Sequence, residues 1–163
     1  MINYLSMVER IKERKTLAKM LAYSNKILTL LNYISYPVFI AVAWYLQAEK
    51  LIWYVLVPAI SFVALSVFRH IYNAPRPYEK FDYEPIGKSK AKSGKSFPSR
   101  HTFSAFIIGF MIFDFCLPIG IVFLILSVFL AVARVLCGVH FVKDVLVGSG
   151  FAVLVYLIML LLI

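Results

Sequence analysis

Long runs of apolar residues alternate with short polar segments, and the lengths of these runs predict membrane-spanning helices. Charge-free runs of 20, 18 and 19 residues cover Ile27–Leu46, Leu51–Phe68 and Val145–Ile163. A rise of about 1.5 Å per residue lets each run cross a hydrocarbon core of about 30 Å. The stretch 102–133 is too long for one pass, and Pro118 with Gly120 marks a turn inside it.

We therefore predict an all-α fold, a multi-pass transmembrane helix bundle with about five spanning helices, two of them over about 101–116 and 119–136. Residues 1–26 combine six Lys/Arg and two Glu with apolar residues at helical spacing, which predicts an N-terminal amphipathic helix. Either it lies at the membrane interface or it is a solvated basic tail. The predicted organisation is a basic segment, 1–26, and a membrane-embedded bundle, 27–163.

Composition agrees with a membrane protein. Hydrophobic residues make up 62% of the chain and charged residues only 15%, where soluble domains carry roughly 25% charged residues. A soluble globule and an intrinsically disordered chain are therefore excluded. The two Cys residues, both in apolar surroundings, exclude a disulfide scaffold.

The net charge of +9 is confined to two segments. Residues 1–26 carry +4, residues 69–100 carry +5, and the charges elsewhere cancel. An apolar and basic chain is typical of a membrane protein that meets an anion, whether phosphate, acidic lipid or nucleic acid. The lysine run at 88–95 is interpreted as a solvated loop.

Three polar clusters interrupt the apolar pattern at the ends of the predicted helices. The second predicted helix ends and the third begins on the same membrane face, and the third and fourth cross and return, so the five-pass count brings all three clusters to one membrane surface. They are Arg69 with Arg76-Pro77, then Phe97-Pro98-Ser99-Arg100-His101, then Arg134 with His140 and Asp144.

These residue types suit phosphoryl transfer. Guanidinium groups bind phosphoryl oxygens in fork geometry. His140 and Asp144 are four residues apart and share a helix face, so the carboxylate can hold one ring N–H while His101 remains as a second acid or base. The residues alone leave open which His is the nucleophile. Metal-ligand spacing is not found, so we expect metal-independent chemistry without a cofactor.

Each cluster also has a plainer interpretation. Arg69 and Arg76 can anchor a helix end beside anionic lipid. Ser99 can be an N-cap, and His140 with Asp144 can be a satisfied pair at a helix terminus. Because these features occur together and in order, we favour the phosphoryl-transfer site.

The clusters resemble the signature of the type 2 phosphatidic acid phosphatase superfamily, integral-membrane lipid phosphatases that share their site with vanadium haloperoxidases. That signature reads Lys, six residues, Arg-Pro; then Pro-Ser-Gly-His; then Ser-Arg, five residues, His, three residues, Asp. The resemblance spans residues 69–144. Three positions depart from it, with Arg69 in place of Lys, Arg100 in place of Gly and Ala133 in place of Ser.

The resemblance implies that His140 attacks phosphorus to form a phosphohistidine, that Asp144 orients it, and that His101 protonates the leaving group. Arg100 is a bulky cation that can reach a second phosphate or a headgroup. The phosphate-binding set implied in this way is Arg69, Arg76, Ser99, Arg100 and Arg134.

We therefore expect a lipid phosphatase whose substrate is a lipid phosphomonoester or diphosphate, first of all undecaprenyl or another polyprenyl diphosphate, because so short a chain lacks a headgroup-recognition domain. Phosphatidylglycerol phosphate and phosphatidic acid are alternatives. A non-catalytic protein that binds anionic lipid is the alternative of another class.

The expected partners are this lipid substrate and membrane lipids, without nucleic acid; the oligomeric state is left open. Basic residues 1–26 favour a cytoplasmic N-terminus and hence a cytoplasmic site. The resemblance favours the outer face of the cell membrane, which we prefer.

Overall fold

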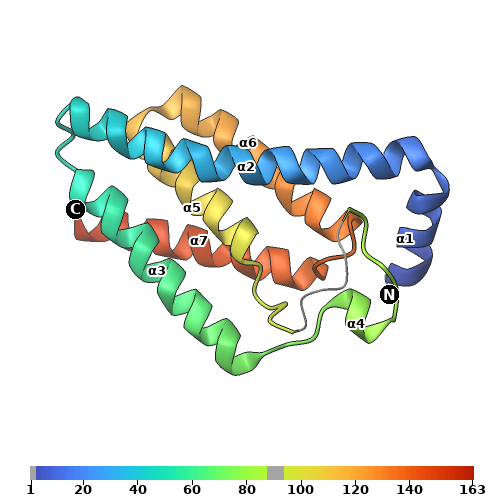
Figure 1. The fold of residues 1–163 in the computed structure, drawn as a ribbon. Helices are drawn as coiled ribbons and strands as arrows, with labels where there is room; N and C mark the ends of the chain where they lie inside the picture. The colour runs from blue at the N-terminus through green and yellow to red at the C-terminus, as the bar shows by residue number, and fades with distance from the viewer. Residues whose placement is uncertain (1–2, 88–93) are drawn as a thin grey trace.

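The computed structural model describes residues 3–87 and 94–163, and every regular element in this part of the chain is a helix. Figure 1 shows long helices side by side, with α1 and α4 at one end of the bundle and the C-terminus at the other. The predicted all-helical fold is confirmed; most of the lysine run lies outside the described residues. The helices are α1 (Tyr4–Glu13), α2 (Lys15–Tyr45), α3 (Leu51–Tyr72), α4 (Pro77–Lys80), α5 (Arg100–Phe115), α6 (Leu117–Leu136) and α7 (Val142–Leu162).

Four of the described helices, α2, α3, α6 and α7, are long and apolar enough to cross a membrane. Helix α5 has 16 residues and spans only about 24 Å. The predicted count of five spanning helices thus becomes four long ones with a shorter helix among them. Because α5 packs against α2, α3, α6 and α7, its neighbours rather than lipid cover most of its surface.

Large apolar side chains are exposed along the outer faces of the four long helices. No part of the described chain covers them, which is the pattern of a surface that faces hydrocarbon. The chain is therefore a multi-pass membrane protein. Examples on α6 are Ile119, Val122, Ile125, Phe129 and Val132.

The predicted N-terminal amphipathic helix is present as α1, but it is shorter than the basic segment 1–26. The first helix ends at Glu13, and α2 begins at Lys15 and continues without a break past residue 26. The apolar face of α1 is buried against protein, with Tyr4 and Val8 in one cluster with residues of the loops before α5 and α7. The hydroxyl of Tyr4 accepts a hydrogen bond from Val142 N at 3.1 Å. This face packs on an aromatic surface of the protein, so α1 is not a free tail. The residues it meets are Tyr78, Tyr83, Ile86, Cys137 and Val139.

The close approach of α7 to the start of α5 depends on Gly148. A Cβ at this position would lie 2.7 Å from the carbonyl oxygen of Ser99, which is closer than such atoms approach. In the same contact Ser99 N donates to the carbonyl oxygen of Asp144 at 2.9 Å. The glycine therefore lets the first turns of α5 and α7, which carry two of the polar clusters, lie against each other.

A polar contact joins the helices at the opposite end of the bundle. Lys50 Nζ lies 3.1 Å from both carboxylate oxygens of Asp114. The hydroxyl of Tyr54 donates to the same carboxylate at 2.8 Å, and Tyr36 donates to the carbonyl oxygen of Tyr54 at 3.1 Å. Helices α2, α3 and α5 are thus connected far from the three clusters.

Candidate active site

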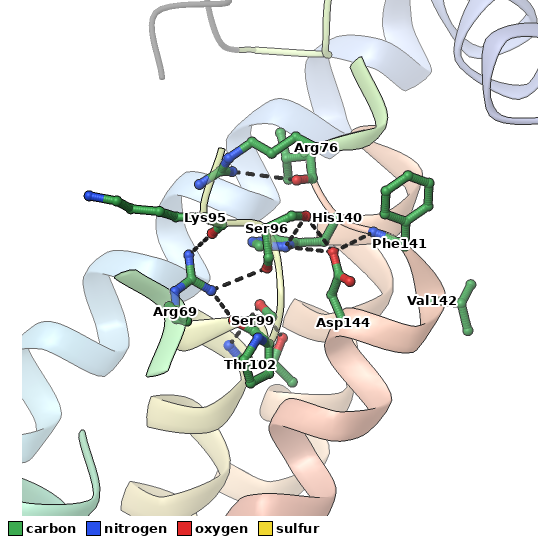
Figure 2. A network of polar contacts seen from close by, with 12 residues as sticks. Arg69, Arg76, Lys95, Ser96, Ser99, Thr102, His140, Phe141, Val142 and Asp144 are labelled. Carbon is green, nitrogen blue, oxygen red and sulfur yellow. Dashed lines mark hydrogen bonds and ion pairs between the residues drawn. The ribbon is translucent and has the colours of Figure 1, made fainter. Parts of the chain in front are cut away.

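The structure brings the three predicted clusters together at one end of the bundle. Figure 2 shows side chains of α3, of the loop before α5 and of the first turn of α7 in one hydrogen-bonded network. The network joins residues up to 63 positions apart in the chain. The sequence-based expectation that the three clusters meet at one surface is confirmed.

Arg69 holds the loop that precedes α5. Its side chain extends from the last turn of α3, and the residue is only 4% exposed. The guanidinium donates to the carbonyl oxygens of Lys95, Ser96 and Pro98, at 3.2 Å for Ser96. A planar fork with five N–H donors can bond several carbonyl oxygens at once. The donors of this predicted phosphate ligand are therefore directed at backbone.

Arg76 connects two loops. Its Nε donates to the carbonyl oxygen of Gly94 at 3.0 Å, and its Nη1 donates to that of Val139 at 3.4 Å. Glu79 accepts from Arg76 N at 2.6 Å and from Gly94 N at 2.7 Å. These bonds fix the loop before α5 beside the residue that precedes His140.

His140 and Asp144 form a buried pair at the start of α7. His140 Nδ1 lies 3.3 Å from Asp144 Oδ2, and the two residues are 1% and 0% exposed. The same carboxylate oxygen accepts from Ser96 Oγ at 2.5 Å and from Phe141 N at 3.0 Å. A carboxylate acceptor at Nδ1 favours the tautomer that carries the proton there, which leaves Nε2 with its lone pair.

Ser99 and Arg100 begin α5. The Ser99 hydroxyl is buried and accepts from Thr102 N at 3.5 Å and from Thr102 Oγ1 at 3.0 Å, so it serves as the N-cap that its sequence position also allowed. Arg100 is exposed, and its guanidinium lies 5.6 Å from the centre of the Phe62 ring. The two neighbours thus differ, one turned into the fold and one turned out of it.

Arg134 and His101 lie on another side of the site. Arg134 is 1% exposed and donates through Nη2 to Thr29 Oγ1 of α2 at 2.7 Å. Its Nε has no hydrogen-bond partner among the described residues. His101 is half-buried on the first turn of α5 and faces the same cavity as Thr29.

Two cavities share Arg100 as a lining residue. The larger, of about 550 Å³, lies between α2, α3, α5 and α6, and its lining along α5 extends from Arg100 and His101 to Ile107 and Ile108. The smaller, of about 390 Å³, is basic. Its lining residues are Ser66, Arg69, His70, Arg76, Gly94, Lys95 and Arg100.

Residues 50–163 match the sequence model of the PAP2 superfamily. This region is more than half of the chain and contains all three clusters. The chain belongs to the PAP2 superfamily. The resemblance inferred from the three motifs is thus confirmed.

A curated relative is the bacitracin transport permease protein BcrC of Bacillus licheniformis, 31% identical over 118 residues. The match covers 71% of this chain and 58% of that protein, so the chain spans less than two thirds of the relative's length.

Two solved structures share the PAP2 fold. LpxE of Aquifex aeolicus has a TM-score of 0.71 at 24% identity, with 86% of each chain covered. The PAP2-type phosphatidylglycerolphosphate phosphatase of Bacillus subtilis has a TM-score of 0.62 at 19% identity, covering 96% of this chain and 90% of that one. Both likenesses concern the fold.

The structure thus distributes six of the eight predicted site residues of this PAP2 protein over three places, and the roles of all eight stay predictions. His140 and Asp144 form the buried pair, and Arg69, Arg76 and Arg100 line the basic cavity. His101 lines the apolar cavity together with Arg100, whereas Ser99 and Arg134 line neither. Among the described residues, no group of three or more His, Cys, Asp or Glu side chains is placed to hold a metal ion.

Ser96 belongs to the site although the sequence analysis did not single it out. The residue is 0% exposed, and its hydroxyl contacts Asp144 Oδ2 and lies 3.5 Å from His140 Nδ1. Its carboxylate partner is 48 positions away in the chain. In the sequence, Ser96 is marked only as a hydroxyl residue two positions before Pro98, and this position does not indicate that its hydroxyl contacts Asp144.

The environment of His140 keeps its ring neutral. Burial lowers the pKa of His140 to about 4, helped by repulsion from Arg76 and Arg134 and opposed by Asp144. The group therefore carries no charge near pH 7, as a nucleophilic imidazole requires.

Acidification is expected to destabilise the protein through His140. An unfolded His binds a proton near pH 6.5, whereas folded His140 does so only near pH 4, so between these values the unfolded state binds more protons. The free energy of unfolding should fall by about 2 kcal/mol from pH 7 to pH 5, measured by denaturant titration in detergent. The free energy of unfolding of His140→Gln, whose side chain cannot titrate, should fall less over the same pH range. An equal fall in both proteins would contradict the assignment of the pH dependence to His140.

Proposed function

We propose that this PAP2 protein is a lipid phosphatase that hydrolyses a lipid diphosphate, with undecaprenyl or another polyprenyl diphosphate as substrate, through a phosphohistidine intermediate. The observation that carries the proposal is the buried His140–Asp144 pair, whose Nδ1 and Oδ2 atoms lie 3.3 Å apart. Arg76, which lines the basic cavity, donates to the residue before His140. A neutral imidazole held by a carboxylate beside fixed cations is an activated nucleophile for phosphorus.

The first step transfers the terminal phosphoryl group to His140. Nε2 attacks phosphorus while the bond between this phosphorus and the bridging oxygen breaks. The Nδ1 proton stays in the hydrogen bond to Asp144, whose charge offsets the positive charge that develops on the ring. His101 donates a proton to the leaving oxygen, and the product is the lipid monophosphate.

The second step releases inorganic phosphate. A water molecule attacks the phosphorus of phosphohistidine, the P–N bond breaks, and Nε2 regains its lone pair. His101, deprotonated after the first step, accepts the proton of the water. The charges of Arg69, Arg76 and Arg134 lower the energy of the negatively charged transition state in both steps.

The apolar cavity supports a lipid as the substrate. It begins beside His101 and follows α5 inward to Ile108 between membrane-spanning helices. Burial of a hydrocarbon chain contributes about 0.8 kcal/mol for each CH₂ group. A tail in this cavity holds its headgroup at the first turn of α5, where Arg100 lines both cavities.

The test is phosphate release by the purified protein in detergent. The panel contains a polyprenyl diphosphate, the polyprenyl monophosphate, phosphatidylglycerol phosphate and phosphatidic acid, each with and without EDTA. We expect the highest kcat/KM for the diphosphate and no effect of EDTA. Strong inhibition that a divalent metal reverses would reject the metal-free mechanism. Preference for a glycerolipid would reject the diphosphate, and binding to anionic vesicles without any phosphate release would reject an enzyme.

We also propose that the site faces the outside of the cell membrane, supported by the resemblance to phosphatases of envelope lipids. Glu84 lies in the loops at the site end and Glu49 in the link between α2 and α3; both are exposed. In a variant without Cys116 and Cys137, an impermeant maleimide applied to intact cells should label Glu84→Cys and spare Glu49→Cys. The reverse pattern would assign the site to the cytoplasm.

A further inference from the structure

The basic cavity holds more positive charge than one phosphoryl group requires. Arg69 and Arg76 line it with their guanidinium groups fixed on backbone carbonyls. Lys95 and Arg100 line it as well, and both residues are exposed. Within residues 3–87 and 94–163 no hydrogen bond or ion pair engages either of these two side chains, so their N–H donors can meet a ligand.

Arg100 occupies the boundary between the two cavities. It lines the apolar cavity next to His101 and the basic cavity next to Arg69. Its guanidinium lies 5.6 Å from the centre of the Phe62 ring on α3, a cation–π contact that holds the cation at this boundary. A lipid with its tail in the apolar cavity and its headgroup in the basic cavity therefore passes Arg100, the residue that lines both cavities. The residue stands where the family signature has Gly, which offers no side chain to a ligand.

We propose that Arg100, assisted by Lys95, forms a subsite for the second, lipid-proximal phosphate of a diphosphate substrate. The inference rests on the proposed function and assigns its substrate class to particular side chains. A planar guanidinium binds two phosphate oxygens at once, and Lys95 adds a mobile charge from the loop that Arg69 holds.

The subsite has a consequence for the first chemical step. When the bond between the terminal phosphorus and the bridging oxygen breaks, the electron pair stays on the lipid monophosphate that leaves. Arg100 lies beside this leaving group and neutralises its growing charge. A phosphomonoester brings no phosphate to this position, so Arg100 should favour diphosphates over monoesters.

The test compares the diphosphate and the monophosphate of one polyprenol with Arg100→Gly and Arg100→Gln. Loss of the subsite should lower the ratio of the two kcat/KM values by a factor on the order of 10², because removal of one transition-state donor has an effect of this size. Lys143→Gln is the matched control: Lys143 is an exposed cation that contacts the Phe97 and Phe141 rings and lines neither cavity. The control should keep the parent's ratio. An unchanged ratio in both Arg100 variants would overturn the subsite.

A binding measurement separates this proposal from the proposed function. A polyprenyl methylenebisphosphonate, which cannot be hydrolysed at the bridging position, and the matching monophosphonate are titrated into parent and Arg100→Gly. We expect the parent to bind the bisphosphonate at least tenfold more tightly than the monophosphonate and the variant to lose this preference. Equal preference in the two proteins would reject the subsite even if the parent hydrolysed no lipid. Preference without any hydrolysis would support the subsite and reject the phosphatase.

Discussion

His140→Ala is expected to lower kcat for phosphate release by at least about 10⁴-fold, because the reaction loses its nucleophile. The hydrogen bond between His140 Nδ1 and Asp144 Oδ2, at 3.3 Å, orients this ring and leaves its Nε2 as the attacking atom. Release of inorganic phosphate in detergent, under saturating polyprenyl diphosphate, measures the effect.

The same experiment has a covalent readout. With substrate labelled in its terminal phosphate, rapid quenching in alkali should trap label on the parent protein, since a P–N bond survives base and breaks in acid. His140→Ala should carry no label. Because removal of the ring leaves Asp144 buried without this partner, His140→Asn serves as a second variant that retains a polar side chain. Residual release above about one tenth of the parent's rate in both variants, with native unfolding midpoints, would reject His140 as the nucleophile.

Asp144→Asn is expected to lower kcat by about 10²–10⁴-fold with a smaller change in KM. Oδ2 of Asp144 receives three donors: His140 Nδ1, Ser96 Oγ at 2.5 Å and Phe141 N at 3.0 Å. An amide keeps the shape but removes the charge that stabilises the phosphorylated ring. It also lets the imidazole adopt the wrong tautomer. Stopped-flow measurement of the phosphorylation step should show the loss before hydrolysis begins.

Asp114→Asn is the matched control for that substitution. Asp114 is another carboxylate within the bundle, paired with Lys50 and Tyr54 at the end away from His140. Its replacement should lower the thermal unfolding midpoint and leave kcat within about threefold of the parent's, as expected for a change that touches no reacting group. If Asp144→Asn and Asp114→Asn lowered kcat equally, general loosening of the bundle would explain both.

Local features of the site could be predicted from the sequence. The pairing of His140 with Asp144 was predicted from their spacing of four residues, although His140 lies two residues before the start of α7 and not on the helix. The N-cap role of Ser99 follows from its place before an apolar helical run, and the meeting of the clusters follows from counting passes. These inferences hold because each depends on neighbours in the chain or on the alternation of membrane crossings.

Other features depend on the path of the backbone and could not be predicted. Arg69 meets the carbonyl oxygens of Lys95, Ser96 and Pro98 only because the loop before α5 folds back over α3. The contact between Arg134 and Thr29 joins residues 105 positions apart. Residue types and spacing therefore indicate which groups are available, whereas the fold decides that Arg69 binds backbone.

The ends of the long helices were predicted less well than their order in the chain. The charged residues placed the end of the basic segment at residue 26, yet α2 begins at Lys15 and continues past that point. One continuous helix can have a polar part followed by an apolar part, so a change in polarity does not require the helix to end. Conversely, α5 can be shorter than a membrane pass because neighbouring helices, and not lipid, cover most of its surface. Hydropathy indicates whether a segment is surrounded by water or by hydrocarbon, whereas backbone hydrogen bonding determines where its helix ends.

A set of contacts at the Asp114 end has a mechanical consequence: Asp114 contacts Lys50 and Tyr54, and Tyr36 contacts Tyr54. It connects α2, α3 and α5 at one end, while the same three helices line the apolar cavity toward the other. A second connection between α3 and α5 lies at the opposite end of the bundle, because Arg69 at the end of α3 also holds the loop before α5 there. The apolar cavity therefore lies along two helices that are held together at both ends, which keeps Arg100 and Asp114 at a fixed separation along the path of a lipid tail.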